Sequence, residues 1–392
     1  MQRFTINIRL YNKNSMKTFN QLFTIFLIFN LFIGCSNEDD NTIVNRNLIP
    51  SSVDFKLNTV DNVFFTQDSG LLITGTYNNK TTIIKADYKF DIKWTRNNYE
   101  WGNLFSGTGW GTSFYSANIT KILQKEDGKY VCICSIEQGG DVLYSSTLLI
   151  VLNQDGEQIQ KIEFQDNRTT NIIQTNDGGY LLFGSKLIKL DRNYKQQWSK
   201  NLIDQIYNQY QIVSTAVGGF ATTGTYNNDQ VFLKKNDSNG NEISSLTYKY
   251  SDYPFEEAGF DLIQLNDEGF LIVGRTGKTF VPNVVNCQII RTNALGDTIW
   301  TKRFGGSTNC WLDRFIFHNQ NEFVIQGSDG FPNEFQKSIL IRINSEGQIL
   351  DSISTKKFQM MLCSPLKFYI KVQNKDEDHI TLIKIETQNL FN

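Results

Sequence analysis

Residues suited to catalysis are scarce and scattered in this sequence. Only two histidines, His318 and His379, occur among 392 residues, and both fall in expected strands or their turns. The chain has no G-x-S-x-G, H-E-x-x-H or C-x-x-C motif, which would mark a nucleophile elbow, a zinc protease or a redox pair. We therefore assign no catalytic residue. The composition favours a protein that is not an enzyme, without excluding one.

One segment, Asn236-Asp237-Ser238-Asn239-Gly240-Asn241-Glu242, has the closely spaced oxygen-bearing side chains that calcium prefers. The equivalent positions Asn153-Gln154-Asp155-Gly156-Glu157 and Asn344-Ser345-Glu346-Gly347-Gln348 are ordinary turn sequences, with glycine where a positive φ is needed. This internal comparison favours a hairpin turn over a metal site. We expect no metal and no cofactor.

The cysteines predict little chemistry apart from the first, Cys35. Cys132 and Cys134 lie two residues apart in an expected strand and therefore on one face, where two buried thiols are the simplest interpretation. Cys287 and Cys310 could form a disulfide in an oxidising compartment, and the sequence leaves their pairing open. Because Cys363 makes the number after Cys35 odd, at least one thiol is free.

The charged residues exclude one class of function and leave another open. Lysine and arginine number 38 against 40 acids, for a net charge of −2, so there is no basic excess for nucleic-acid binding. Adjacent acids occur at Glu256-Glu257 and Asp376-Glu377-Asp378. Adjacent loop acids are usually solvated, and only geometry could show a pair able to cleave a glycosidic bond.

The N-terminal residues 1–35 have the features of a targeting signal. An apolar stretch, Leu22 to Ile33, follows Lys17 and is shorter than the roughly 20 residues of a membrane span. Translation from Met16 would give a more compact signal. The segment Leu31-Phe32-Ile33-Gly34-Cys35 resembles a bacterial lipoprotein signal peptide, although Phe32 and Ile33 replace the usual leucine and small residue. The resemblance implies that Cys35 becomes the lipidated N-terminus, with acyl chains such as palmitate holding it to a membrane.

The residues after Cys35 suggest where the protein is exported. Ser36-Asn37-Glu38-Asp39-Asp40 resembles the acidic export tag of surface lipoproteins in Bacteroidetes-type bacteria. This resemblance implies a lipid-anchored protein of the cell envelope, in the outer membrane and exposed at the surface. Residues 36–51 would be a flexible tether. A plain signal peptide or a signal anchor with an incidental cysteine is the alternative.

The body of the chain is built from repeats about fifty residues long. Each begins with a polar or glycine turn and a short apolar strand that usually ends near glycine; the six clear copies are 69–75, 128–134, 178–184, 218–224, 268–274 and 321–327, with a degenerate copy at 376–383. A second apolar strand ending in Asp or Asn follows in the clear copies, then a turn and another strand. Three of these later strands carry a tryptophan: Trp94, Trp198 and Trp300.

A fourth strand precedes each turn, and helical periodicity is absent. Strands that are apolar on both faces suit a sheet packed between two similar sheets. Four-stranded sheets repeated around an axis form a β-propeller. We predict an all-β, seven-bladed β-propeller of four-stranded antiparallel blades over residues 52–392, with six or eight blades as alternatives. The seventh repeat has only two clear strands after Leu366, and Ser52–Leu57 would complete it and close the ring.

The repeat motifs also resemble those of a known group. Residues 177–184 read D-G-G-Y-L-L-F-G, and 187–198 read L-I-K-L-D followed by W at the end; Thr301 to Ser307 matches the joint between blades. These motifs resemble extracellular β-propeller lipoproteins of unknown function from Bacteroidetes-type bacteria, which implies an architecture but no activity. The strand pair ending in tryptophan also resembles quinoprotein dehydrogenases, but the chain has no adjacent cysteines and only partial motifs.

In an up-and-down sheet, the loops after strands two and four leave from the same end, and here these are the long loops. They gather aromatic residues, and exposed aromatic clusters mark binding surfaces; the candidate ligand-binding residues are Trp101, Phe105, Trp110, Tyr115, Tyr144, Phe280, Trp311 and Phe331. The alternative is that these rings pack under their own loops and plug the channel. We predict a surface-anchored lipoprotein that binds a glycan or protein partner through this face, with the membrane as its other partner. A polysaccharide-active enzyme with converging channel acids and a structural subunit of an envelope complex are the alternatives.

The signal generates a direct prediction. Cys35→Ser should abolish incorporation of labelled palmitate and release the protein from the membrane fraction, because only the cysteine sulfur can carry the first lipid. Cys132→Ser should still incorporate the label. Undiminished labelling of the Cys35 variant would contradict the lipoprotein assignment.

Overall fold

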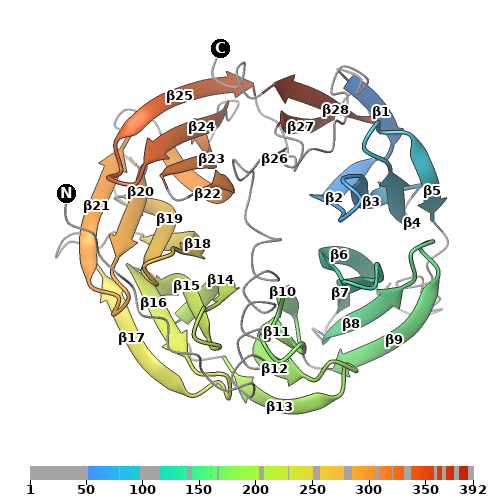
Figure 1. Ribbon diagram of the computed structural model, residues 1–392, viewed down its shortest axis with the longest axis horizontal. Helices are drawn as coiled ribbons and strands as arrows, with labels where there is room; N and C mark the ends of the chain where they lie inside the picture. The colour runs from blue at the N-terminus through green and yellow to red at the C-terminus, as the bar shows by residue number, and fades with distance from the viewer. Residues whose placement is uncertain are drawn as a thin grey trace, which may run out of the picture.

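The fold is an all-β ring of seven four-stranded antiparallel sheets (Figure 1). The computed structural model describes residues 52–78, 80–97, 115–138, 144–165, 167–202, 207–227, 229–249, 257–277, 285–305, 309–319, 321–330, 337–356, 360–363, 368–374 and 379–386. It confirms the seven-bladed β-propeller, so the six- and eight-bladed alternatives were wrong. No helix capable of crossing a bilayer occurs within these ranges.

Each blade runs from an inner strand beside the central axis to an outer strand at the rim (Figure 1). Blade 1 contains β2 (Thr59–Phe65), β3 (Leu71–Tyr77), β4 (Lys80–Ala86) and β5 (Ile92–Arg96). Blade 2 contains β6 (Tyr115–Gln124), β7 (Tyr130–Gln138), β8 (Tyr144–Leu152) and β9 (Gln158–Gln165). Blade 3 contains β10 (Thr169–Gln174), β11 (Tyr180–Gly184), β12 (Lys186–Leu190) and β13 (Gln196–Asn201).

The remaining blades repeat this order. Blade 4 contains β14 (Tyr207–Ser214), β15 (Phe220–Tyr226), β16 (Gln230–Asn236) and β17 (Glu242–Tyr248). Blade 5 contains β18 (Ala258–Gln264), β19 (Phe270–Gly277), β20 (Val285–Thr292) and β21 (Thr298–Phe304). Blade 6 contains β22 (Asn309–His318), β23 (Glu322–Gly330), β24 (Lys337–Asn344) and β25 (Ile349–Lys356). Blade 7 contains β26 (Met360–Cys363), β27 (Phe368–Asn374), β28 (His379–Glu386) and β1 (Ser52–Lys56).

The ring closes where the two ends of the fold meet in blade 7. Strand β1 pairs antiparallel with β28, with Ser52 opposite Ile383 and Lys56 opposite His379. Phe55 and Leu57 are buried in one cluster with residues of both blade 7 and blade 1. The predicted N-terminal closing strand is thus confirmed, and it joins the last blade to the first.

The hydrophobic core lies between blades, where neighbouring sheets pack face to face. One cluster joins Leu72 and Ile83 of blade 1 to Cys132, Cys134 and other side chains of blade 2. Because a middle strand is covered on both faces, it needs an unbroken apolar run, as in the first five residues of β3. Cys132 and Cys134 are free buried thiols, and burial raises their pKa values well above the usual range.

The three repeat tryptophans join each of their blades to the next one. Trp94 of β5 donates from Nε1 to the carbonyl oxygen of Gln154 in blade 2, at 3.0 Å. Its ring lies against Gly156, where an added Cβ would sit 2.7 Å from the indole. Trp198 and Trp300 lie in the same way against glycines of blades 4 and 6. Each of these glycines has a positive φ, so the position serves both the turn and the close approach.

Where no tryptophan precedes the joint, the turn itself supplies the aromatic ring. Phe90 and Tyr194 occupy the glycine position of the turn in blades 1 and 3, with φ values of 70° and 66°. Both are buried, Phe90 among residues of blade 7 and Tyr194 beside residues of blade 2. These strained backbones are compensated by packing, because each ring fills the space that a tryptophan fills elsewhere.

The same three blades that carry tryptophan hold a buried cation at the end of their third strand. Lys189 of β12 is only 4% exposed and pairs with Asp177 at 2.8 Å, and it also donates to the carbonyl oxygen of Leu190. Although burial opposes this effect, hydrogen bonds from Lys189 and Thr175 lower the pKa of Asp177 to about 2. Lys85 pairs likewise with Asp68, and Arg291 with Asp267. Each pair ties the third strand to the first turn of its own blade.

A disulfide between Cys287 of β20 and Cys310 of β22 adds a covalent joint between blades 5 and 6. Their Cα atoms are 5.1 Å apart, which lies within the usual range for a disulfide. Both side chains are buried in the cluster that these blades share. The sequence left this pairing open, and the fold decides it by bringing the inner strand of blade 6 against the third strand of blade 5.

Two glycines with nearly the same φ separate the turn from the joint. Gly240→Ala should lower the free energy of unfolding by about 3 kcal/mol, because the methyl group would meet Trp198 at 2.8 Å and also strain the left-handed backbone. Gly178→Ala is the control, since its φ of 77° matches the 73° of Gly240 but no atom lies within 4 Å of the added Cβ. It should cost about 1 kcal/mol. Equal losses in urea denaturation would argue against the tryptophan joint.

Candidate functional site

The two ends of the ring are built differently. At one end, which we term the short-turn face, strands one and two of each blade, and strands three and four, join through tight turns closed by their own hydrogen bonds. Asp237, in the segment that looked like a calcium loop, accepts through Oδ1 from the backbone N–H groups of Asn239 and Asn241. These contacts confirm a hairpin turn there. No group of three metal-ligating side chains occurs in the described part of the chain.

The opposite end, the long-loop face, carries the connections after strands two and four. Tyr115 and Tyr144 lie at this end of blade 2, each paired in register with Gln138 of β7. Trp311 lies near the same end of blade 6, opposite Ser328, and is half-buried. The other predicted ligand-binding residues, Trp101, Phe105, Trp110, Phe280 and Phe331, lie outside the described residues, as does Cys35. Their binding role stays a prediction.

The inner strands of blades 1 to 6 share a feature that the sequence analysis did not find. Each has a register shift that leaves one bulged residue. The residue after the bulge is polar or charged in all six strands; these residues, which we term the channel belt, are Asn62, Lys121, Asn171, Gln211, Asp261 and Arg314. Because these strands surround the axis of the ring, the belt lies around the central channel (Figure 1).

Hydrogen bonds connect much of the belt from blade to blade. Asn171 donates to the Gln211 amide oxygen, and Gln211 Nε2 donates to Asp261 Oδ1 at 2.8 Å. Asp261 Oδ2 accepts from the backbone N–H of Phe315 in blade 6, at 2.9 Å. Blades 3 to 6 are therefore joined at the axis by one polar chain. Asn62 joins blade 1 to blade 2 by donating to the Ile119 carbonyl oxygen at 2.8 Å.

Two carboxyl groups near the axis have raised pKa values. Burial raises the pKa of Asp261, although hydrogen bonds from Phe315, Gln211 and Leu262 oppose the shift. Asp61, the bulged residue of β2, has a buried Oδ2 atom with no hydrogen-bond partner, and burial raises its pKa to about 6. The two differ in chemistry, because Asp261 has donors on both oxygens while Asp61 has an idle one.

Lys121 and Arg314 differ from the rest of the belt. Neither makes a hydrogen bond or an ion pair among the described residues, whereas the other four belt residues bond across to the neighbouring blade. Lys121 is half-buried and Arg314 is exposed. Burial lowers the pKa of Lys121; Asp261 raises it, and Arg314 lowers it further by repulsion. The two cations thus feel each other across the channel.

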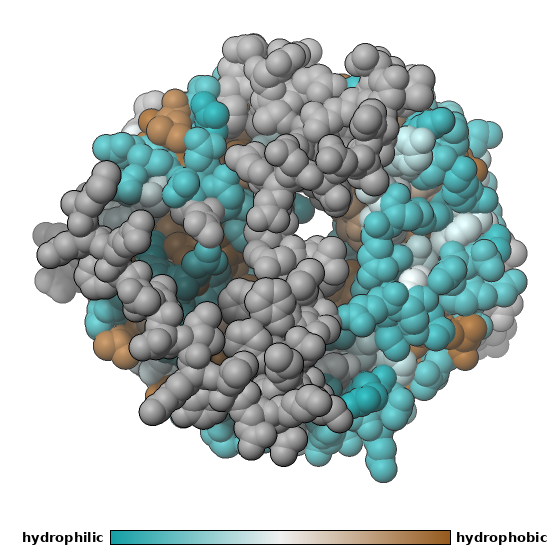
Figure 2. Space-filling model, in the orientation of Figure 1, coloured by the Kyte–Doolittle hydropathy of each residue, from teal (hydrophilic) through white to brown (hydrophobic). Residues whose placement is uncertain are grey.

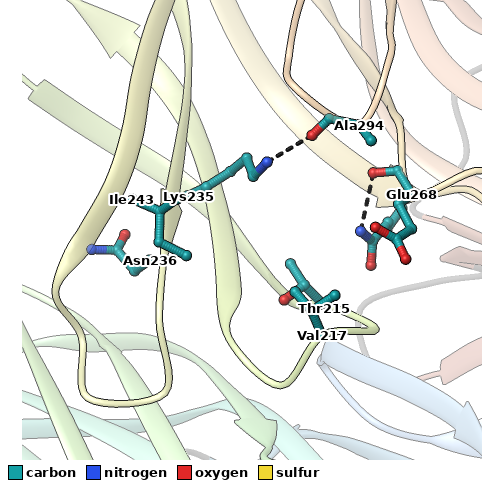
Figure 3. A pocket seen from close by; sticks show the side chains of 8 residues that line it. Thr215, Val217, Lys235, Asn236, Ile243, Glu268 and Ala294 are labelled. Carbon is teal, nitrogen blue, oxygen red and sulfur yellow. Dashed lines mark hydrogen bonds between the residues drawn. The ribbon is translucent and has the colours of Figure 1, made fainter.

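A small hollow at the short-turn face between blades 4 and 5 is less suited to a ligand (Figure 3). It has about 290 Å³ of empty space. Two of its polar groups already have partners, since Lys235 Nζ donates to the Ala294 carbonyl oxygen and Gln264 Nε2 donates to that of Glu268. The hollow reads as a seam between blades. The described part of the face seen in Figure 2 is mainly hydrophilic, with scattered apolar residues.

The channel belt was missed because the bulge hides it. A bulge adds one residue and breaks the alternation on which a strand pattern is read. A positional signal was nevertheless present: each belt residue stands nine positions before the first apolar residue of the second strand, as Asn62 does before Leu71 and Asp261 before Phe270. Aligning the repeats on that residue would have shown the polar column.

Comparisons with known proteins agree with the fold and leave the function open. No protein-family model matches the sequence, and a search of curated proteins gives no match. A Bacteroides caccae protein of unknown function is 14% identical, covering 73% of this chain and 93% of its own, with a TM-score of 0.43. The WD40 domain of Toxoplasma gondii coronin is 9% identical, covering 88% of this chain and 90% of its own, with a TM-score of 0.49.

The idle carboxyl of Asp61 predicts a pH-dependent stability. Because its folded pKa of about 6 exceeds the model value of 3.8, the folded state holds the proton more tightly, and this group's contribution to stability falls as pH rises from about 4 to 6. Asp61→Asn should remove that loss. The variant should therefore gain on the wild type over this range, by up to about 3 kcal/mol, and then stay level.

Urea denaturation between pH 4 and 7.5 measures this difference. Asp237→Asn is the control, since Asp237 sits in an exposed turn where backbone hydrogen bonds lower its pKa. Its difference from wild type should run in the opposite direction. A pH-independent gain for Asp61→Asn would show that burial does not shift this carboxyl.

Proposed function

We propose that this protein is a surface-anchored lipoprotein whose β-propeller is a non-enzymatic binding module for a glycan or protein partner. The observation that carries the proposal is the difference between the two faces of the ring. The short-turn face is made of turns whose polar groups bond to one another, as in Asp237. The connections of variable length, and the aromatic positions Tyr115, Tyr144 and Trp311, belong to the other face.

The path of the chain supports this orientation. Ser52, the first residue of β1, pairs with Ile383 near the end of β28 and so lies at the short-turn face. A lipid on Cys35 would connect there through residues 36–51, and a flexible segment of that length spans roughly 20–25 Å on average. The long-loop face would then point away from the membrane, where a ligand can reach it.

The disulfide supports an extracytoplasmic location. Disulfides persist in oxidising compartments and are rare where thiol reductants are maintained. The bond between Cys287 and Cys310 joins two blades inside the core, which is a structural position. A protein that folds outside the cytoplasm can rely on such a bond, in agreement with export as a lipoprotein.

The carboxyl groups at the axis favour binding over hydrolysis. Glycoside hydrolysis requires two carboxyl groups on either side of one bond, one to donate a proton and one to act as base or nucleophile. Asp261 accepts from Gln211, Leu262 and Phe315, so its oxygens are committed to holding blades together. Asp61 alone retains an idle oxygen, and one carboxyl group does not make that pair.

The decisive test compares ligand binding by two versions of the chain from residue 36 onward, which retains every described strand. The wild type should bind a glycan on an array or capture a protein from an envelope extract, and Trp101→Ala with Trp110→Ala should lose that ligand. Trp101→Phe with Trp110→Phe is the control, because it keeps the aromatic rings. Equal melting temperatures would show that all versions fold.

The outcomes are distinct. Loss with alanine and retention with phenylalanine supports the long-loop face as the binding surface. A ligand that the alanine variant retains would move the site elsewhere on the ring. No ligand for a folded wild type would contradict the binding module and favour a structural role in an envelope complex.

A further inference from the structure

The channel belt contains two cations whose partners are missing. In blades 1, 3, 4 and 5 the belt residue bonds to a neighbouring blade or residue of the belt. Lys121 of β6 and Arg314 of β22 occupy the same position after the bulge and form no such bond. An unpaired charge that is partly withdrawn from water costs free energy, unless an opposite charge reaches it. The belt is therefore complete everywhere except at its cations.

The acids near the axis leave the two cations unsatisfied. Asp261 already accepts from three donors. Asp313, beside Arg314, has Ser328 of β23 as a 3.5 Å hydrogen-bond partner on its own blade. Asp61, on blade 1, forms no ion pair with either cation. Repulsion between Lys121 and Arg314 remains uncompensated by any ion pair, and a bound anion would relieve it.

The strands that supply the two cations also carry aromatic positions at the long-loop end. On β6, Tyr115 precedes Lys121 by six residues, or about 20 Å of strand. On β22, Trp311 precedes Arg314 by three residues, or about 10 Å. A ligand entering from the long-loop face would pass an aromatic position before reaching each cation. Aromatic faces followed by cations suit sugar rings that carry acidic groups better than they suit a flexible acidic peptide.

We propose that the central channel binds the acidic group of a glycan, a carboxylate or a sulfate, between Lys121 and Arg314. This inference rests on the proposed binding function and names its ligand class. Lys121 acts as a compact point charge, and the planar guanidinium of Arg314 can bind two oxygens of the anion at once. Glycan residues outside the channel would lie along the long-loop face.

Calorimetric titration of the chain from residue 36 tests the site with matched ligands. The probes are an oligogalacturonate, its fully methyl-esterified form, a sulfated oligosaccharide and an oligoglutamate of similar charge. We expect the oligogalacturonate or the sulfated sugar to bind, and the ester and the peptide to bind at least about tenfold more weakly. Which acidic sugar binds distinguishes a carboxylate from a sulfate.

Charge-neutralising variants locate the anion. Lys121→Gln and Arg314→Gln should each weaken binding of the acidic sugar about tenfold or more, because each removes a charge-assisted hydrogen bond. Lys121→Arg should retain most of the binding, which shows that charge is what matters. Lys93→Gln is the matched control, since it removes a charge from an exposed lysine at the short-turn end of β5; it should bind as wild type does.

Each contrary result overturns the proposal. These results are unchanged binding in both channel variants, equal binding of the ester, tighter binding of the oligoglutamate, or no binding of either acidic sugar. The proposed function fails separately. If a ligand depends on Trp101 and Trp110 but not on Lys121 and Arg314, the binding module stands without the channel site; if no ligand binds at all, both are wrong.

Discussion

The structure depends on one constraint: every sheet must bury both of its faces against another sheet. A four-stranded sheet with two apolar faces cannot end a stack, so the sheets must return upon themselves. Pairing of β1 with β28 meets this requirement by placing the first strand of the fold in the last blade. Phe55 and Leu57 then fill the contact between blades 7 and 1. Closure therefore makes every blade interface depend on every other, and no edge of the ring is left exposed at an end sheet.

Once the ring is closed, its blades must be held at a fixed spacing at two radii. At the rim, Trp94, Trp198 and Trp300 reach from blades 1, 3 and 5 onto glycines of the next blade. The same three blades carry the buried pairs typified by Lys189 with Asp177. A buried charge pair adds little net stability against its desolvation cost, so we interpret these pairs as fixing turn geometry. At the axis, the Asn171, Gln211 and Asp261 chain does the corresponding work with hydrogen bonds.

The sequence predicted what repetition encodes and missed what a single insertion changes. Glycine turns and double-faced apolar strands recur in every repeat, so the four-stranded blades and their closing strand could be predicted. The tryptophans were visible, but their partners were not, because the glycine that each one meets lies in the following repeat. The channel belt was hidden by a bulge, which shifts the facing of Asn62 or Asp261 without altering composition. The Cys287–Cys310 pairing depends on the distance between two strands from different blades, which no local pattern contains.

The belt also separates residues that stabilise the ring from residues that do not. Asn171, Gln211 and Asp261 each bond to a neighbouring blade, so their polarity is explained by the ring itself. Lys121 and Arg314 stand at equivalent positions, yet their charges repel and gain no partner. An amide or hydroxyl side chain at either place could have continued the hydrogen-bonded chain at less cost. Charges that the fold does not use, at the one place that all the blades share, are best explained by something that the fold binds.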